Sequence, residues 1–424
     1  MTSRSRTLAA RFVVPVEGPP IADGLVAIRG GRITEVAPRA GRRADLDLGN
    51  AAITPGFVNA HTHLELEPVH GQPDDRPDDQ IAWLKRVIRQ RRRGSRQQWR
   101  SASYRNVAAA VRAGTTMLAD ITTAGASWDA VAAAPVRAAV FSEVIGLRRE
   151  RAMETNQRAW EWIASVGPEA QVSACARVGL SPHAPYSTAG WLYRRAAECR
   201  LPLTTHLAEM PEELELLDRG PGRLREFLEE LGAWDDDWTP IGPRPADFVR
   251  RGELRRADWL IAHGTYLDPA DFWQLRPEAA PDGQRVAVAY CPRTHARFGH
   301  DPHPFRLMLE RGVIVCLGTD SLASAPTLSI LDEMRFLHRR DPSLPGALLL
   351  TMGTLFGAWA LRAETVTGSL RPGKSADLAV VPLPDRDGAD PYPLILESDL
   401  PVAATMFEGR FVSGPWTETA APRP

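Results

Sequence analysis

The architecture of this chain follows from one segment, Thr54-Pro55-Gly56-Phe57-Val58-Asn59-Ala60-His61-Thr62-His63-Leu64-Glu65. Within it, the apolar run 57–60 ends in two histidines that are one residue apart. Residues i and i+2 of a β-strand point to the same side. At the end of a strand, His61 and His63 can therefore offer two imidazole nitrogens to one divalent metal. A pair of this kind is more often two partly exposed loop histidines. The pair alone therefore does not predict a metal site, and further ligands must come from the rest of the chain.

Three further strand-like runs also close on a polar residue. Leu203 to Glu209 contains His206, Trp259 to Gly264 contains His263, and Val313 to Asp320 ends in Asp320. A satisfied core histidine is the usual explanation for any one of them. Polar residues collected from the carboxyl ends of separate parallel strands are typical of the (β/α)8 barrel. The four runs in this order predict that α/β fold, a TIM-type barrel.

Together these residues resemble the amidohydrolase superfamily, and the resemblance covers nearly the whole chain. The family pattern is HxH after strand 1, a histidine after each of strands 5 and 6, and an aspartate after strand 8. The resemblance assigns His61, His63, His206 and Asp320 to the metal and places His263 beside it. Zinc is the expected ion and ferrous iron is the alternative, because both suit this ligand set.

The distribution of lysine bears on the number of metal ions. Some superfamily members hold two metals that are bridged by a carboxylated lysine after strand 4. This chain has only Lys85 and Lys374, and both are far from that position. We therefore expect one divalent metal ion per chain.

Composition limits the other classes of function. The 424 residues include 51 basic and 52 acidic side chains, so the net charge of −1 predicts no nucleic-acid and no membrane partner. The arginine-rich run 85–93 is interpreted as a solvated helix face. The apolar stretch 347–361 is interrupted and too short to span a bilayer. The amino terminus lacks a signal-peptide pattern, and the cysteines are scattered, which predicts free thiols in the cytoplasm: Cys175, Cys199, Cys291 and Cys316.

The order of elements predicts a barrel of residues 55–365 and a small composite β-sandwich built from residues 1–54 and 366–424. The long segment Gly220 to Gly252, between strands 5 and 6, is expected to form a lid or a wall of the site. Eight strands are expected in the barrel, at Ala51–Ala60, Thr115–Ala119, Ala138–Ile145, Ala176–Leu180, Leu203–Thr205, Trp259–Ala262, Arg285–Tyr290 and Val313–Leu317.

Glu209 follows His206 by three residues and points to the type of reaction. A glutamate near a helix amino terminus is favourable to the helix dipole and needs no further role. In the family, a glutamate at this spacing resembles the proton shuttle of the aminohydrolases, which moves a proton from water to a ring nitrogen of the substrate. The same resemblance implies that His263 hydrogen-bonds the oxygen that develops negative charge. It also implies that Asp320 accepts a proton and passes it to the leaving amine. The predicted reaction is deamination of a cyclic amidine, with release of ammonia.

Further residues narrow the branch. His183, in Pro-His-Ala-Pro-Tyr-Ser, resembles a substrate contact of the S-adenosylhomocysteine and methylthioadenosine deaminases. Glu65 and the segment around Glu209 look closest to the 6-aminodeoxyfutalosine deaminases of menaquinone synthesis. Arg148 is an expected contact for a carboxylate tail or, equally, a solvated loop arginine, and Ser321 is an expected substrate contact. The stretch 83–92 lacks the carboxylate with which the S-adenosylhomocysteine deaminases bind ribose.

Two other functions remain as alternatives. The first is removal of another leaving group on the same scaffold, as in chlorohydrolases or cyclic amide hydrolases. The second is a non-catalytic assembly subunit. Such a subunit should have lost some of the metal-ligating residues, whereas every expected ligand is present. A homodimer is the expected assembly. His295, His300 and His303 follow strand 7, where the family shapes the substrate pocket. His295 or Arg293 is expected to line that pocket, in preference to a second metal site formed by the three histidines.

Overall fold

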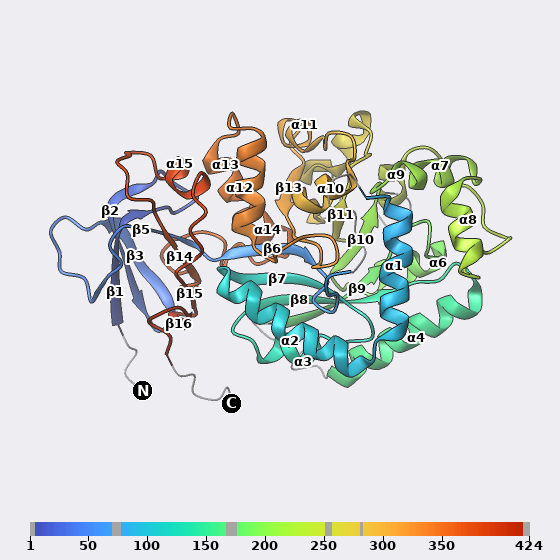
Figure 1. The fold of residues 1–424 in the computed structure, drawn as a ribbon, viewed down its shortest axis with the longest axis horizontal. Coiled ribbons are helices and arrows are strands. Elements are labelled where there is room, and N and C mark those ends of the chain that lie inside the picture. The colour runs from blue at the N-terminus through green and yellow to red at the C-terminus, as the bar shows by residue number, and fades with distance from the viewer. Residues whose placement is uncertain (1–4, 70–77, 167–175, 251–256, 280–282, 419–424) are drawn as a thin grey trace.

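The computed structural model describes residues 5–69, 78–166, 176–250, 257–279 and 283–418. Cys175 lies outside these ranges. At the centre is an eight-stranded parallel sheet in which consecutive strands are neighbours (Figure 1). Its strands are β6 (Phe57–Thr62), β7 (Thr115–Thr122), β8 (Arg137–Val144), β9 (Ala176–Pro182), β10 (Leu203–Leu207), β11 (Trp259–His263), β12 (Val286–Tyr290) and β13 (Ile314–Leu317).

The sheet closes on itself where β13 returns to β6. Just beyond β13, the backbone N–H groups of Thr319 and Asp320 donate to the carbonyl of His61 at 3.1 and 3.0 Å. Thr62 and Asp320 form an isolated parallel bridge. The predicted barrel is therefore confirmed, and its seam brings a histidine of the first strand beside the aspartate of the last.

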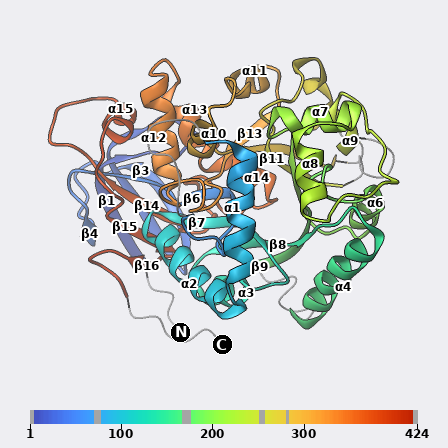
Figure 2. The ribbon, with the colours of Figure 1, turned by 45° about the vertical axis from the view of Figure 1, so that its right-hand side comes forward.

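Helices surround the barrel (Figure 2). Apolar side chains fill the space between strands and helices. A second apolar cluster, from β6, β7, β8, β11, β12 and β13 together with residues in and after α14, fills the barrel interior. None of the described helices combines the length and the apolar composition that a membrane crossing requires. The α-helices are α1 (Gln80–Arg93), α2 (Arg96–Arg112), α3 (Trp128–Ala133), α4 (Arg149–Val166), α6 (Gly190–Glu198), α7 (Pro211–Arg219), α8 (Arg223–Glu230), α9 (Pro245–Arg250), α10 (Pro292–Phe298), α11 (Phe305–Glu310), α12 (Ile330–Arg340), α13 (Gly346–Met352), α14 (Leu355–Ala360) and α15 (Pro391–Leu396).

Strands from both ends of the chain form a second sheet, at the left of Figure 1. It is one continuous mixed sheet with the order β16-β15-β14-β5-β1-β2-β3, and β4 pairs with β1. Its own apolar core is separate from that of the barrel. The two ends of the chain thus come together as expected, but in a single mixed sheet where a β-sandwich was expected. Its strands are β1 (Ser5–Val13), β2 (Ile21–Arg29), β3 (Arg32–Pro38), β4 (Leu46–Asp47), β5 (Ala51–Pro55), β14 (Leu378–Pro382), β15 (Ala404–Phe407) and β16 (Arg410–Ser413).

The prediction of one strand over Ala51–Ala60 is wrong. The chain forms β5 in the terminal sheet and β6 in the barrel, with Gly56 between them. A Cβ at Gly56 would lie 2.1 Å from the Thr116 hydroxyl oxygen, so only glycine allows this close approach to β7. Both strands are buried, so both are apolar in sequence. The change from one sheet to the other is therefore not visible in the sequence.

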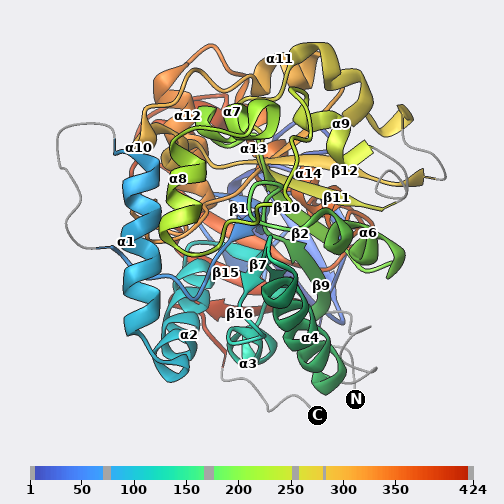
Figure 3. The same ribbon diagram turned by 90° about the vertical axis from the view of Figure 1, so that its right-hand side faces the viewer.

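Helices α1 and α8 lie side by side at the edge of the barrel mouth (Figures 2 and 3). Their apolar faces share one cluster that includes Ile81 and Phe227, and Lys85 forms an ion pair with Glu230 at 2.5 Å. The described part of the segment 220–252 therefore packs against the helix that follows the first strand. It forms a wall of the mouth.

Candidate active site

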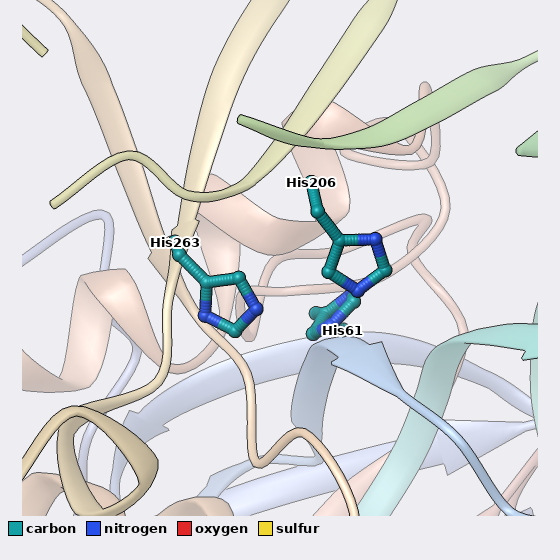
Figure 4. Close-up of side chains that lie close together, drawn as sticks. All are labelled: His61, His206 and His263. Carbon is teal, nitrogen blue, oxygen red and sulfur yellow. The ribbon is translucent and has the colours of Figure 1, made fainter. Parts of the chain in front are cut away.

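Five side chains from four strand ends converge at the carboxyl end of the barrel. Nε2 of His63 lies 3.4 Å from Nε2 of His206 and 3.8 Å from Oδ1 of Asp320. His61 belongs to two groups whose ligand atoms lie within 4.8 Å of one another, one with His206 and His263 and one with His63 and Asp320. Figure 4 shows the rings of His61, His206 and His263 turned toward one another. The structure thus brings together every residue that the sequence assigned to the metal.

Local contacts set the chemical state of His206. Its Nδ1 lies 3.1 Å from the carbonyl of His183, which can only accept, so Nδ1 carries the proton and Nε2 faces the cluster with a free lone pair. Burial, with the nearby His183 as a smaller cause, lowers the pKa of His206 to about 3. A neutral imidazole oriented in this way is the form that binds metal.

Backbone conformation places the two polar groups at the ends of β11 and β13. His263 and Asp320 both have left-handed conformations, with φ of 66° and 54°. Non-glycine residues rarely adopt this region, and such strain is concentrated at functional sites. Gly318 allows the approach of β13 to β6, because a Cβ there would lie 2.8 Å from Cβ of His61.

The donor set fits a divalent metal ion. Nε2 of His61 is buried and has no hydrogen-bond partner among the described residues. An orphaned buried nitrogen of this kind is costly unless a ligand satisfies it. Burial holds the pKa of His61 well below its ordinary value, so the ring is neutral at pH 7. Imidazoles with one carboxylate are a ligand set that zinc and ferrous iron both accept.

Glu209 stands beside this cluster. Its Oε1 lies 3.4 Å from Nε2 of His263, and its backbone N–H donates to Glu213 at 2.9 Å. Burial, followed by the nearby carboxylates of Asp320 and Glu213, raises the pKa of Glu209 well above its usual range. A carboxyl group with a raised pKa can accept a proton near neutral pH and hold it for transfer.

Gln80, the first residue of α1, contacts this site and was not predicted from the sequence. Its Nε2 donates to Oε1 of Glu209 at 2.6 Å, and its Oε1 lies 2.8 Å from Nε2 of His300. The side chain thus bridges segments that follow the first, fifth and seventh barrel strands. No motif marks it, because a single glutamine in a helix has no characteristic neighbours.

We expect Gln80→Leu, which keeps the size of the side chain but removes both hydrogen bonds, to lower kcat about tenfold, the effect of losing one hydrogen bond to a charged group. The hydrogen bond from Gln80 lowers the pKa of Glu209. Its loss raises that pKa, so the acidic limb of the pH profile of kcat/KM should move to higher pH. Steady-state kinetics between pH 5 and 9 measure both effects.

The matched control is Gln97→Leu, at an exposed position of α2. It should leave kcat and the pH profile unchanged. An unaltered kcat and acidic limb in the Gln80 variant would contradict a positioning role for this glutamine.

Glu65 is held by internal partners. One carboxylate oxygen accepts from the Thr122 hydroxyl and from the backbone N–H of Thr123, and the other accepts from Arg91. The interpretation of residues 85–93 as a solvated face is therefore wrong for Arg91, which turns inward and stacks over Trp99, 4.7 Å from the ring centroid. The network fixes the loop that carries His63, and both oxygens of Glu65 are occupied.

Asp120 holds the same loop from below. Its Oδ1 accepts the backbone N–H of Leu64 at 2.8 Å and its Oδ2 accepts the Ser127 hydroxyl at 2.5 Å. Burial raises the pKa of Asp120 to about 8. Asp320 is held in a similar way, because Oγ of Ser324 donates to its Oδ2 at 2.7 Å. Neither Asp120 nor Ser324 was predicted from the sequence.

The expected substrate contacts lie in different surroundings. The ring of His183 is 4.8 Å from that of His206, its Nδ1 is 2.6 Å from Oγ of Ser187, and burial lowers its pKa to about 4. Ser321 is fully buried next to Asp320. Arg148 is exposed, and its guanidinium donates to the carbonyl of Gly232 at 3.4 Å, away from the histidine cluster.

A small cavity adjoins Glu209 and His263, and His295 and His300 also line it. Arg293, the other expected residue of this wall, is also on α10 and forms an ion pair with Glu333 at 2.7 Å. Nε2 of His303 lies 2.7 Å from the backbone carbonyl of His263, and its ring stacks on Tyr290. Within the described ranges, the three histidines after the seventh strand form no group that could hold a metal.

Known proteins share both the sequence pattern and the fold. The model of the amidohydrolase family matches residues 52–412. The 5-methylthioadenosine/S-adenosylhomocysteine deaminase of Moorella thermoacetica is 31% identical over 389 residues, which cover 87% of this chain and 83% of that protein.

Two solved structures have the same fold. The adenosine deaminase of Xanthomonas campestris, with bound zinc, has a TM-score of 0.78 at 22% identity and covers 98% of this chain and 94% of its own. The aminofutalosine deaminase of Helicobacter pylori has a TM-score of 0.77 at 20% identity and covers 97% and 100%. With the family match over most of the sequence and the histidine cluster at the barrel mouth, this chain belongs to the amidohydrolase family and is one of its metal-dependent enzymes.

Proposed function

We propose that the chain is a hydrolytic deaminase that replaces the exocyclic amino group of a purine-like nucleoside with a carbonyl and releases ammonia. The observation that carries the proposal is the position of Glu209, 3.4 Å from His263 and beside the histidine cluster. A carboxyl group placed there can accept a proton from the attacking water and donate it to a ring nitrogen of the substrate. Hydrolysis of an ordinary amide or phosphoester needs no such shuttle to a ring nitrogen.

We assign His61, His63, His206 and Asp320 as ligands of one divalent ion, with zinc as the first choice. When bound, such an ion supplies a water nucleophile that ionises near neutral pH. The relatives support a metal site of this kind, since the Xanthomonas campestris structure contains zinc.

Each remaining role belongs to a side chain of the protein. Glu209 takes a proton from the attacking water at its carboxylate and delivers it to the ring nitrogen next to the reacting carbon. His263 donates from Nε2 to the oxygen that develops negative charge. Asp320 accepts the second proton and passes it to the departing amine. Ammonia and a lactam-type carbonyl are the products, so atoms and protons balance.

The best candidate substrate is 6-aminodeoxyfutalosine or a similar adenine nucleoside. Two observations support this class: the resemblance around Glu65 and Glu209, and relatives named as deaminases of adenine nucleosides and of aminofutalosine. His183, beside His206, is the proposed contact to the heterocycle, and Ser321 is a second one. A part in menaquinone synthesis, a homodimer and a cytoplasmic location stay predictions.

The test is a substrate panel with metal-loaded protein: 6-aminodeoxyfutalosine, S-adenosylhomocysteine, 5′-methylthioadenosine, adenosine, guanine and cytosine. Ammonia release and the ultraviolet shift of the 6-amino to 6-keto conversion are followed together. We expect rapid turnover of at least one 6-aminopurine nucleoside and none of cytosine. If no compound of the panel is turned over but a chlorinated triazine or a cyclic amide is, deamination is contradicted and removal of another leaving group is supported.

A further inference from the structure

Glu143 is an inward-facing carboxylate at the mouth of the barrel. It lies on β8, two and four residues after Phe141 and Ala139, which belong to the apolar cluster inside the barrel. That cluster also contains Leu260 and Ala287 from the opposite side of the barrel, so its members on β8 point inward. Alternate residues of a strand share a face. Glu143 therefore points into the barrel at its catalytic end.

Ser181, on the neighbouring strand β9, faces the same space. It pairs in register with Glu143, just as Gly179 pairs with Phe141. A Cβ at Gly179 would lie 2.5 Å from the ring of Phe141, so Gly179 faces the interior and Ser181, two residues later, does too. Ser181 is fully buried, and its hydroxyl has no partner among the described residues.

The carboxylate of Glu143 has no hydrogen bond or ion pair within the described ranges. The ionisable groups that influence it are Arg91 and His206, but His206 is neutral and Arg91 is engaged with Glu65 and Thr123. Burial raises the pKa of Glu143, which reflects the absence of compensating donors. An unpaired carboxylate next to an unpaired hydroxyl is unusual inside a protein and normal where a ligand completes the contacts.

The position of this pair relates it to the substrate. In a ring of eight strands, β9 lies opposite β13 and β8 lies opposite β12. Glu143 and Ser181 are therefore across the mouth from Asp320 and Cys291. They lie two strands and one strand away from His206 on β10, on the side away from His263. A substrate whose reacting carbon lies at the histidine cluster can place its remaining part against them.

The hydrogen-bond donors of a purine nucleoside determine which of its groups can bind a carboxylate at this position. In an adenine nucleoside the ring nitrogens N1, N3 and N7 only accept hydrogen bonds, and the exocyclic amine is held at the reacting centre. The remaining donors are the hydroxyls of the sugar. An ionised carboxylate only accepts, through two oxygens, which suits two adjacent hydroxyls.

We propose that Glu143, supported by Ser181, determines specificity by accepting hydrogen bonds from the vicinal hydroxyls of a ribonucleoside substrate. The inference rests on the proposed deamination of purine nucleosides. It supplies a ribose-recognising carboxylate from the third barrel strand in a chain whose stretch 83–92 contains none.

The test compares each ribonucleoside with its 2′,3′-dideoxy analogue, for adenosine and for 5′-methylthioadenosine. Binding is measured by titration calorimetry on the metal-loaded protein and turnover by ammonia release. In the wild type the ribonucleoside should be favoured about tenfold or more in affinity and in kcat/KM, as expected for hydrogen bonds to a charged group. In Glu143→Gln and Glu143→Ala this ratio should fall toward one. Ser181→Ala should lower the ratio less.

Glu150→Gln, at an exposed position of α4, is the matched control and should keep the wild-type ratio. Metal content and the thermal transition show that each variant is folded. An unchanged ratio in the Glu143 variants, or a wild type that binds both sugars equally, overturns the inference and leaves deamination intact. A ratio that is lost in binding, with no ammonia released by any form, supports the inference and contradicts deamination. A wild type that binds no nucleoside contradicts both.

Discussion

The variant Glu209→Gln should lose at least about 10³-fold in kcat while it keeps its metal. General acid–base catalysis contributes roughly 10²–10⁴-fold, and this carboxyl group is proposed to serve two successive proton transfers. A glutamine keeps the volume of the side chain but cannot carry a proton between water and substrate. Because Glu209 is not a proposed ligand, the metal content should match the wild type.

Two measurements separate this role from a structural one. Metal analysis by mass spectrometry reports on the cluster, and single-turnover kinetics report on the chemical step. Glu229→Gln, on the outer face of α8 where Glu229 pairs with Arg225, is the matched control and should retain full activity. A Glu209→Gln enzyme with kcat within about threefold of the wild type would contradict the proton shuttle.

The barrel and its metal site could be predicted because both depend on local patterns. Each ligand closes a buried strand, and the carboxyl ends of parallel strands meet on one face. Spacing within His61-Thr62-His63 and position after a strand for His206, His263 and Asp320 therefore singled out these residues, and the family resemblance assigned their roles. The structure adds the seam at which β13 returns to β6 and the left-handed backbone that turns the last two side chains inward.

The supporting contacts could not be predicted because they join segments that are distant in sequence. Gln80 and Glu209 are 129 residues apart, and Asp120 reaches the backbone of Leu64 across 56 residues. Neither has a spacing that would distinguish it from a surface residue. Ser324 is the exception, since a serine four residues after Asp320 is in a position to cap that carboxylate.

The composition of a segment also gives a wrong prediction for a single side chain whose surroundings differ from those of its sequence neighbours. The run 85–93 is basic, and Arg89, Arg92 and Arg93 in it are exposed, yet Arg91 turns inward to Glu65. Similarly, Glu143 lies in an apolar strand, where its sequence neighbours predict only burial. In both cases the decisive fact is which face of the element meets the barrel mouth, and that depends on the packing of the whole fold.

Replacing His61 with alanine should remove the metal and abolish turnover. His61 is shared by both groups of potential ligands, so its loss leaves neither group complete. We expect metal content to fall from one ion per chain to below about 0.1, and ammonia release to fall at least about 10³-fold, because the water nucleophile no longer ionises near neutral pH. His338→Ala on α12, outside the cluster, is the matched control and should keep both.

Stability gives a readout that does not depend on activity. A ligand that binds only the folded state adds about 3–4 kcal/mol to the free energy of unfolding at 100–1,000 times its Kd. A chelator should therefore lower the Tm of the wild type and of His338→Ala by several degrees, and should leave the Tm of His61→Ala unchanged. If His61→Ala retained the metal and its response to chelator, the ion would be held elsewhere. The shared position of His61 in the cluster would then have no part in binding it.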